Sequence, residues 1–197
     1  MEDKNLSEKE SLELITRMIK NTQSKFEINA GVPFLIFGYL SVIAAVSVWF
    51  AVTRTGNPQW NFLWFIILII GYPVMMITNR KKVKGVKSFV DGVITKLWIV
   101  FGVAAFLVSL DAMFFYNIEN ILFIIVLLMG MGTALTGMII RFLPSIIAGF
   151  ASIAISFLLL QIEDYDQCLV FAALFVLMMV IPGHILNCKG KKNVERA

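Results

Sequence analysis

Six apolar blocks fill most of this 197-residue chain, and each is close to the length that a helix needs to cross a lipid bilayer. A spanning helix requires about 20 apolar residues, because the hydrocarbon core is roughly 30 Å thick and a helix rises about 1.5 Å per residue. We therefore predict an all-α fold: a polytopic membrane protein with six transmembrane helices, preceded by a cytoplasmic N-terminal amphipathic helix. The predicted spans are residues 30–52, 60–77, 96–116, 121–140, 142–162 and 168–186.

The basic residues predict the orientation of these spans. Of the 17 Lys and Arg residues, 16 fall before the first span, after the sixth, or in the loops that follow the second and fourth; Arg54 alone lies on the other side. Loops rich in Lys and Arg stay on the cytoplasmic side of a membrane. We therefore expect both termini to be cytoplasmic. The predicted organisation is a cytoplasmic segment over 1–29, a transmembrane bundle over 30–188 and a basic cytoplasmic tail over 189–197.

Composition argues against several classes of protein. Hydrophobic residues make up 59% of the chain and charged residues 15%, whereas charged residues are about a quarter of a soluble domain. A sequence pI of about 9.1 does not indicate nucleic-acid binding, because the cations lie at membrane edges, where topology accounts for them. Cys168 and Cys188 would lie about 30 Å apart at opposite ends of the last span, too far for a disulfide. With a single His and no metal-ligand motif, we expect no metal and no cofactor.

The segment before the first span has the pattern of an amphipathic helix. Ser7 and Glu10 form a capping box, and apolar residues then recur at steps of three and four. The apolar stripe contains Leu12, Ile15, Ile19 and Phe26. One interpretation is that the stripe rests on the inner leaflet or on the protein's own loops. The other is that it docks a cytoplasmic protein partner or a second copy of the chain, because its polar face mixes Glu with Lys instead of being strongly basic.

A basic cluster follows the second span. Its members are Arg80, Lys81, Lys82 and Lys84. Topology alone explains such a cluster, and the alternative is that it binds anionic lipid head groups. Apolar residues beyond it keep helical spacing, so we expect the third helix to begin before it enters the bilayer.

Three polar residues are candidates for a function within the membrane. Asp111 is the one acid inside a span, about 7 Å below its outer edge, where an ionised acid is costly without a partner. Beside Ser109, it either contributes to a transport path for a cation or proton or stabilises packing near the interface. His184 follows Pro182-Gly183, where we expect the last helix to be kinked or to end at the cytoplasmic boundary. Asp111 and His184 then lie near opposite faces, and no other catalytic set is visible, so we expect no enzymatic activity.

Small residues recur along the fourth and fifth spans. Gly130 pairs with Ala134 and Ser145 with Gly149, and a further stripe contains Ala148, Ser152 and Ser156. Such stripes let helix backbones approach closely in lipid. They indicate either packing within one copy or the face of a homo-oligomer.

Two stretches support a family resemblance. The first span opens with Gly31-Val32-Pro33-Phe34-Leu35-Ile36-Phe37-Gly38-Tyr39, and the last closes with Pro182-Gly183-His184. Together with the amphipathic segment, they resemble small six-span integral membrane proteins of Bacteroidetes-type bacteria. The resemblance covers most of the chain and implies a location in the bacterial inner membrane, but it implies no activity.

By elimination, we expect a non-enzymatic multi-pass membrane component that binds or regulates a protein partner through its N-terminal helix and basic inner face. The alternative is a small transporter or permease subunit for a cation or small molecule. Its path would be lined by Asp111, the Met-rich segments and helix breaks near Gly71 to Pro73 and near Pro182 to Gly183.

Overall fold

The computed structural model describes residues 8–80, 89–115 and 120–195, with side chains over 31–78, 90, 92–114 and 120–190. These residues form helices joined by short turns, and no strand occurs among them. The elements are α1 (Glu8–Thr55), η1 (Pro58–Phe65), α2 (Ile66–Arg80), α3 (Phe89–Phe115), α4 (Ile121–Ile139), α5 (Leu143–Ser156), η2 (Phe157–Leu160), η3 (Asp164–Asp166), α6 (Gln167–Phe175), η4 (Val176–Val180) and α7 (Ile181–Glu195).

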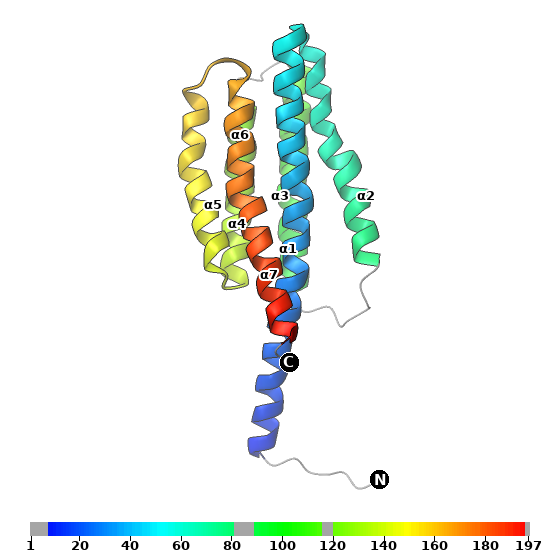
Figure 1. Ribbon diagram of the computed structural model, residues 1–197, viewed down its shortest axis with the longest axis vertical. Coiled ribbons are helices and arrows are strands. Elements are labelled where there is room, and N and C mark those ends of the chain that lie inside the picture. The colour runs from blue at the N-terminus through cyan, green and yellow to red at the C-terminus, as the bar shows by residue number, and fades with distance from the viewer. Residues whose placement is uncertain (1–7, 81–88, 116–119, 196–197) are drawn as a thin grey trace.

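Six stretches of the described chain are helical, long and apolar enough to cross a membrane. They are Gly31–Thr55, Pro58–Thr78, Gly92–Phe114, Ile121–Ile139, Leu143–Leu160 and Asp164–Gly190. The predicted all-α polytopic fold is confirmed. Figure 1 shows that α1 begins and α7 ends at the same end of the bundle. We call this the terminal end, where Gly31, Arg141 and Lys189 lie, and the other the far end, where Arg54 and Asp166 lie.

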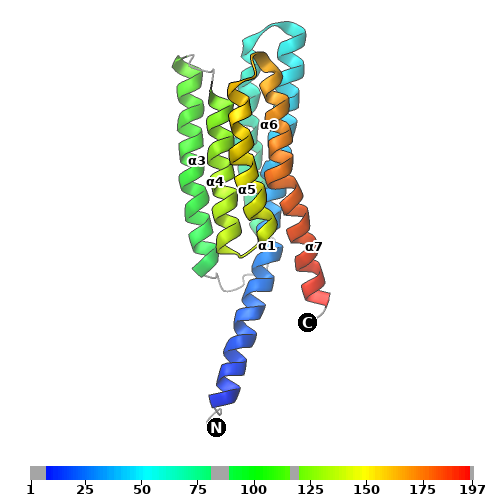
Figure 2. The ribbon, with the colours of Figure 1, turned by 90° about the vertical axis from the view of Figure 1, so that its left-hand side faces the viewer.

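The N-terminal segment and the first span are one continuous helix. α1 runs unbroken from Glu8 to Thr55 and contains Pro33 in its interior. Proline has no backbone N–H to donate, and membrane helices tolerate this loss when neighbouring groups satisfy the freed carbonyl. Residues 8–30 lie before the candidate span and extend the helix by roughly 35 Å at its usual rise. Figures 1 and 2 show this part projecting from the terminal end, away from the other helices.

Helix α1 has neighbours on several sides. α6, η4 and α7 pack along one side of it, and η1 and α2 along another. α4 and α5 form a close pair, and α3 packs against α4, as Figure 2 shows. The main buried cluster joins α1, α4 and α6 and includes Val48, Val126 and Phe171. α2 and α3 are peripheral, because Gly71 and Ala112 are the only buried residues among their described side chains.

The small residues of α4 and α5 face each other within one copy of the chain. A methyl group added at Gly149 would lie 2.6 Å from the backbone nitrogen of Ala134, and one at Gly137 would lie 2.7 Å from that of Ile146. The stripe on α5 is buried, namely Ser145, Ala148, Gly149, Ser152 and Ser156. The intramolecular interpretation of these stripes is confirmed, since side chains larger than these would separate the two backbones.

Helices continue through both proline segments. α2 extends through Gly71 and Pro73 to Arg80, without the break that the transport alternative invokes. In the last span, the π-helical turn η4 directly precedes α7, which contains Pro182 and ends at Glu195. Proline has no backbone N–H and its ring crowds the previous turn, so a wider π turn accommodates it. The predicted irregularity is thus a π turn, and the expectation that the helix ends there is wrong.

Candidate functional site

His184 is hydrogen-bonded to a tyrosine of the first span. The hydroxyl oxygen of Tyr39 lies 2.7 Å from His184 Nε2, and the two rings meet edge to face with centroids 5.9 Å apart. Both side chains are exposed on the surface of the bundle. The hydroxyl donates to Nε2 or accepts from it, according to the tautomer of the imidazole.

This pair lies inside the apolar spans. His184 belongs to span Asp164–Gly190 and Tyr39 to span Gly31–Thr55. The structure supplies His184 with a hydrogen-bond partner on another span, which the sequence did not indicate. Because each polar group satisfies the other, the cost of placing them in hydrocarbon falls.

Glycines allow α1 and α7 to approach closely enough for this hydrogen bond. A methyl group added at Gly31 would lie 2.7 Å from Asn187 Oδ1, and one at Gly183 would lie 3.0 Å from the Leu35 side chain. The stretches that begin at Gly31 and include Gly183, singled out in the sequence, thus form one helix contact.

Asp111 and Ser109 lie on α3, apart from His184. Asp111 is exposed near the far end of span Gly92–Phe114. Ser109 Oγ donates to the carbonyl of Ala105, one turn earlier in the same helix, at 2.8 Å. α3 packs against α4, whereas α7 packs against α1. The structure therefore does not gather the three polar candidates into one site.

The candidate partner and lipid contacts lie at the terminal end of the chain. The stripe residues Leu12, Ile15, Ile19 and Phe26 belong to the projecting part of α1, whose side chains are outside the described set. Arg80 is the last residue of α2. The cluster residues Lys81, Lys82 and Lys84 lie outside the described residues.

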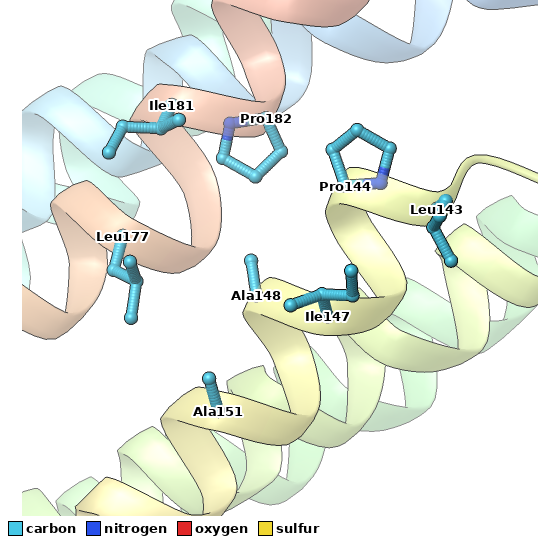
Figure 3. A pocket seen from close by; sticks show the side chains of 8 residues that line it. All are labelled: Leu143, Pro144, Ile147, Ala148, Ala151, Leu177, Ile181 and Pro182. Atoms are coloured by element: carbon cyan, nitrogen blue, oxygen red, sulfur yellow. The ribbon is translucent and has the colours of Figure 1, made fainter.

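An apolar groove that sequence reasoning missed separates α5 from η4 and α7. Figure 3 shows its lining side chains, which are Leu143, Pro144, Ile147, Ala148, Ala151, Leu177, Ile181 and Pro182. Its volume is about 370 Å³, and it is open along the surface of the bundle. The spacing of Pro144, Ile147, Ala148 and Ala151 places them on one helix face, but only the path of α7 shows that this face is left open.

Two tryptophans connect helices through their indole N–H groups. Trp98 on α3 donates to Thr136 Oγ1 on α4 at 3.2 Å, and its ring meets Phe34 of α1 edge to face at 5.8 Å. At the far end, Trp49 donates to Asp166 Oδ1 at 2.9 Å. These rings therefore contribute to helix packing in addition to the interfacial positions typical of tryptophan.

Among the described residues, no group of three or more His, Cys, Asp or Glu side chains is placed to hold a metal ion. Comparison with protein families, with curated proteins and with solved structures finds no match to this chain. The functional argument therefore depends on the residues and their arrangement.

Proposed function

We propose that this chain is a non-enzymatic component of a bacterial inner membrane that binds a cytoplasmic protein partner through the projecting part of α1. In this proposal the terminal end faces the cytoplasm, in keeping with the distribution of 16 of the 17 basic residues. The observation that carries the proposal is the continuity of α1, which joins the amphipathic stripe rigidly to a membrane span.

Continuity bears on what the stripe contacts. A helix that rests on a leaflet lies roughly parallel to the membrane plane, and reaching that plane from a spanning helix requires a bend. α1 has no break between Glu8 and Thr55, and Figure 2 shows the projecting part running on from the bundle. An apolar stripe held away from the membrane favours a helix-in-groove contact with a protein.

The arrangement gives less support to transport. Asp111 is exposed on the peripheral helix α3, and Ser109 is satisfied within that helix. The groove between α5 and α7 is lined by apolar side chains, which provide no ligands for a cation. Transport is therefore the alternative outcome of the experiment below.

The test is site-specific photo-crosslinking of the full chain in its native membrane. A benzophenone amino acid at Ile15, on the stripe, should form a protein adduct of one discrete mass, whereas the same probe at Glu13, on the opposite side, should not. The adduct should disappear in the Leu12→Glu, Ile19→Glu variant. It should persist in the matched Lys9→Glu, Lys20→Glu variant, which alters the polar side.

Two results would overturn the proposal. The first is a spin label at Ile15 that reports burial among acyl chains when the protein is reconstituted alone, because the stripe would then bind lipid. The second is ion or solute flux in proteoliposomes that the Asp111→Asn substitution abolishes.

A further inference from the structure

The groove between α5 and α7 requires an apolar occupant. Its lining consists of aliphatic side chains and two prolines, and Figure 3 shows Pro144 and Pro182 facing each other across it. Water has no polar partners in such a space. A flexible hydrocarbon chain fits it, since hydrocarbon is the solvent at this depth and the helices that line the groove are spans.

Two cations lie at the terminal end of this groove. Arg141 is exposed in the turn between α4 and α5, directly before the lining residues Leu143 and Pro144. Lys189, on α7, is exposed and places its Nζ 5.8 Å from the centroid of the Phe142 ring in the same turn. The ammonium group of α7 thus extends across to α5 at the point where the apolar lining stops.

An apolar channel with positive charge at one end is complementary to an anionic amphiphile. We infer that the groove binds one anionic phospholipid of the leaflet at the terminal end, with an acyl chain between α5 and α7 and its phosphate beside Arg141 and Lys189. The guanidinium of Arg141 offers a planar set of donors, and Lys189 adds a second positive charge beside it. Basic pockets between helices at a membrane surface bind anionic head groups in this way.

Charge also distinguishes a lipid from the other candidates for this groove. A partner helix or a second copy would fill the apolar channel with side chains, whereas a phospholipid fills it with an acyl chain and carries its anionic phosphate at one end, where the cations lie. Phe142 and Leu186 are buried in one cluster, and Lys189 Nζ lies 5.8 Å from the Phe142 ring, so the cations adjoin the last apolar side chains at this end of the groove. The inference is independent of partner binding by the N-terminal helix.

The test measures lipid retained by the purified full chain. The protein is exchanged into micelles that contain equal amounts of phosphatidylglycerol and phosphatidylcholine with identical acyl chains, and bound lipids are counted by native mass spectrometry. Wild type should retain one phosphatidylglycerol in strong preference to phosphatidylcholine. Because each basic residue near an anionic head group contributes roughly a fivefold factor, the Arg141→Gln, Lys189→Gln variant should lose that preference by roughly 25-fold.

Matched variants separate the groove from general effects. Ala151→Phe fills the groove and should abolish retention of either lipid, whereas Val103→Phe, at an exposed position on α3 that does not line the groove, should leave retention unchanged. Arg54→Gln removes a cation at the far end and should keep the preference. Retention is compared only among variants whose helical circular dichroism and detergent unfolding midpoint match those of wild type.

Three outcomes would overturn the inference. The first is equal retention of the two lipids by wild type, and the second is a preference that survives loss of both cations. The third is conversion of an oligomer to a monomer by Ala151→Phe without a change in lipid retention, which would assign the groove to contact between copies.

Discussion

Arg141 illustrates a conflict between charge and backbone geometry at one position. Its φ of 54° lies in the left-handed region that glycine enters most easily. The amide of Phe142 donates to the carbonyl of Gly137 at 2.8 Å, and that of Arg141 to the carbonyl of Met138 at 3.2 Å. These are the two hydrogen bonds of a Schellman motif, which usually has glycine where Arg141 stands. A cation at this turn contributes to topology, and the backbone strain is the cost of having it there.

Relief of this strain is measurable. Arg141→Gly should raise the free energy of unfolding by about 1 kcal/mol, since a side chain in the left-handed region costs roughly 1–2 kcal/mol. The measurement is an SDS titration of the purified protein in mixed micelles. The control is Arg54→Gly, inside α1, which should not raise stability because glycine disfavours a helix. A lower unfolding free energy for Arg141→Gly would show that the guanidinium contributes more than the strain costs.

Helices of similar composition pack very differently in this fold. α4 and α5 meet through Gly137 and Gly149, where an added Cβ would collide with backbone atoms, whereas one added at Gly92 or Gly102 on α3 meets nothing within 4 Å. α3 is instead attached through the large ring of Trp98 and its hydrogen bond to Thr136. A glycine in a span therefore allows close helix contact on α4 and α5, whereas on α3 the glycines at 92 and 102 make no such contact.

A pair of alanine substitutions tests this difference. Gly149→Ala should lower the free energy of unfolding by about 1–3 kcal/mol, because the new methyl group overpacks the contact with Ala134. Gly102→Ala, the matched control, should leave stability unchanged or raise it by up to about 1 kcal/mol through helix propensity. Both are measured by SDS titration. Equal effects of the two substitutions would mean that α4 and α5 are not in close contact.

The whole molecule has its charges divided between two ends. The terminal end has Arg141, Lys189, the start of α1 and the end of α7, while the far end has Arg54 and the acids Glu163, Asp164 and Asp166. The two native cysteines are free, with Cys168 buried and Cys188 exposed near the terminal end. This asymmetry makes the proposed orientation accessible to a labelling experiment.

In the proposed orientation, which follows the positive-inside rule, the terminal end is cytoplasmic. A membrane-impermeant maleimide should therefore leave wild-type Cys188 unlabelled in spheroplasts and label it after lysis. The reciprocal probe is Gln59→Cys in a Cys188→Ser background, at an exposed position near the far end. This probe should react before lysis. Labelling of Cys188 in sealed spheroplasts would reverse the orientation and remove the basis for a cytoplasmic partner.

Of the candidate site, the sequence identified single residues but not their neighbours. His184 is distinctive as the one His in the chain, yet its hydrogen bond to Tyr39 joins residues 145 positions apart. The close contacts of Gly31 with Asn187 and of Gly183 with Leu35 are visible only in the structure. The groove left no comparable signal, because Ala148 and Ala151 resemble the other small residues of α5.

The number of spans, their approximate limits and the all-α class followed from the amino-acid sequence alone, because bilayer thickness sets the length of an apolar block and each block is a local property. The tertiary structure decided which helices touch, that α1 continues unbroken through its amphipathic segment, and where α5 and α7 leave a groove. In water, a helix shows its buried face by apolar periodicity. In lipid, the face against another helix and the face against acyl chains are both apolar, so apolar periodicity does not tell them apart. The rotation and crossing angle of each helix are set by how the side chains of neighbouring helices fit together, and that fit exists only once the helices are packed.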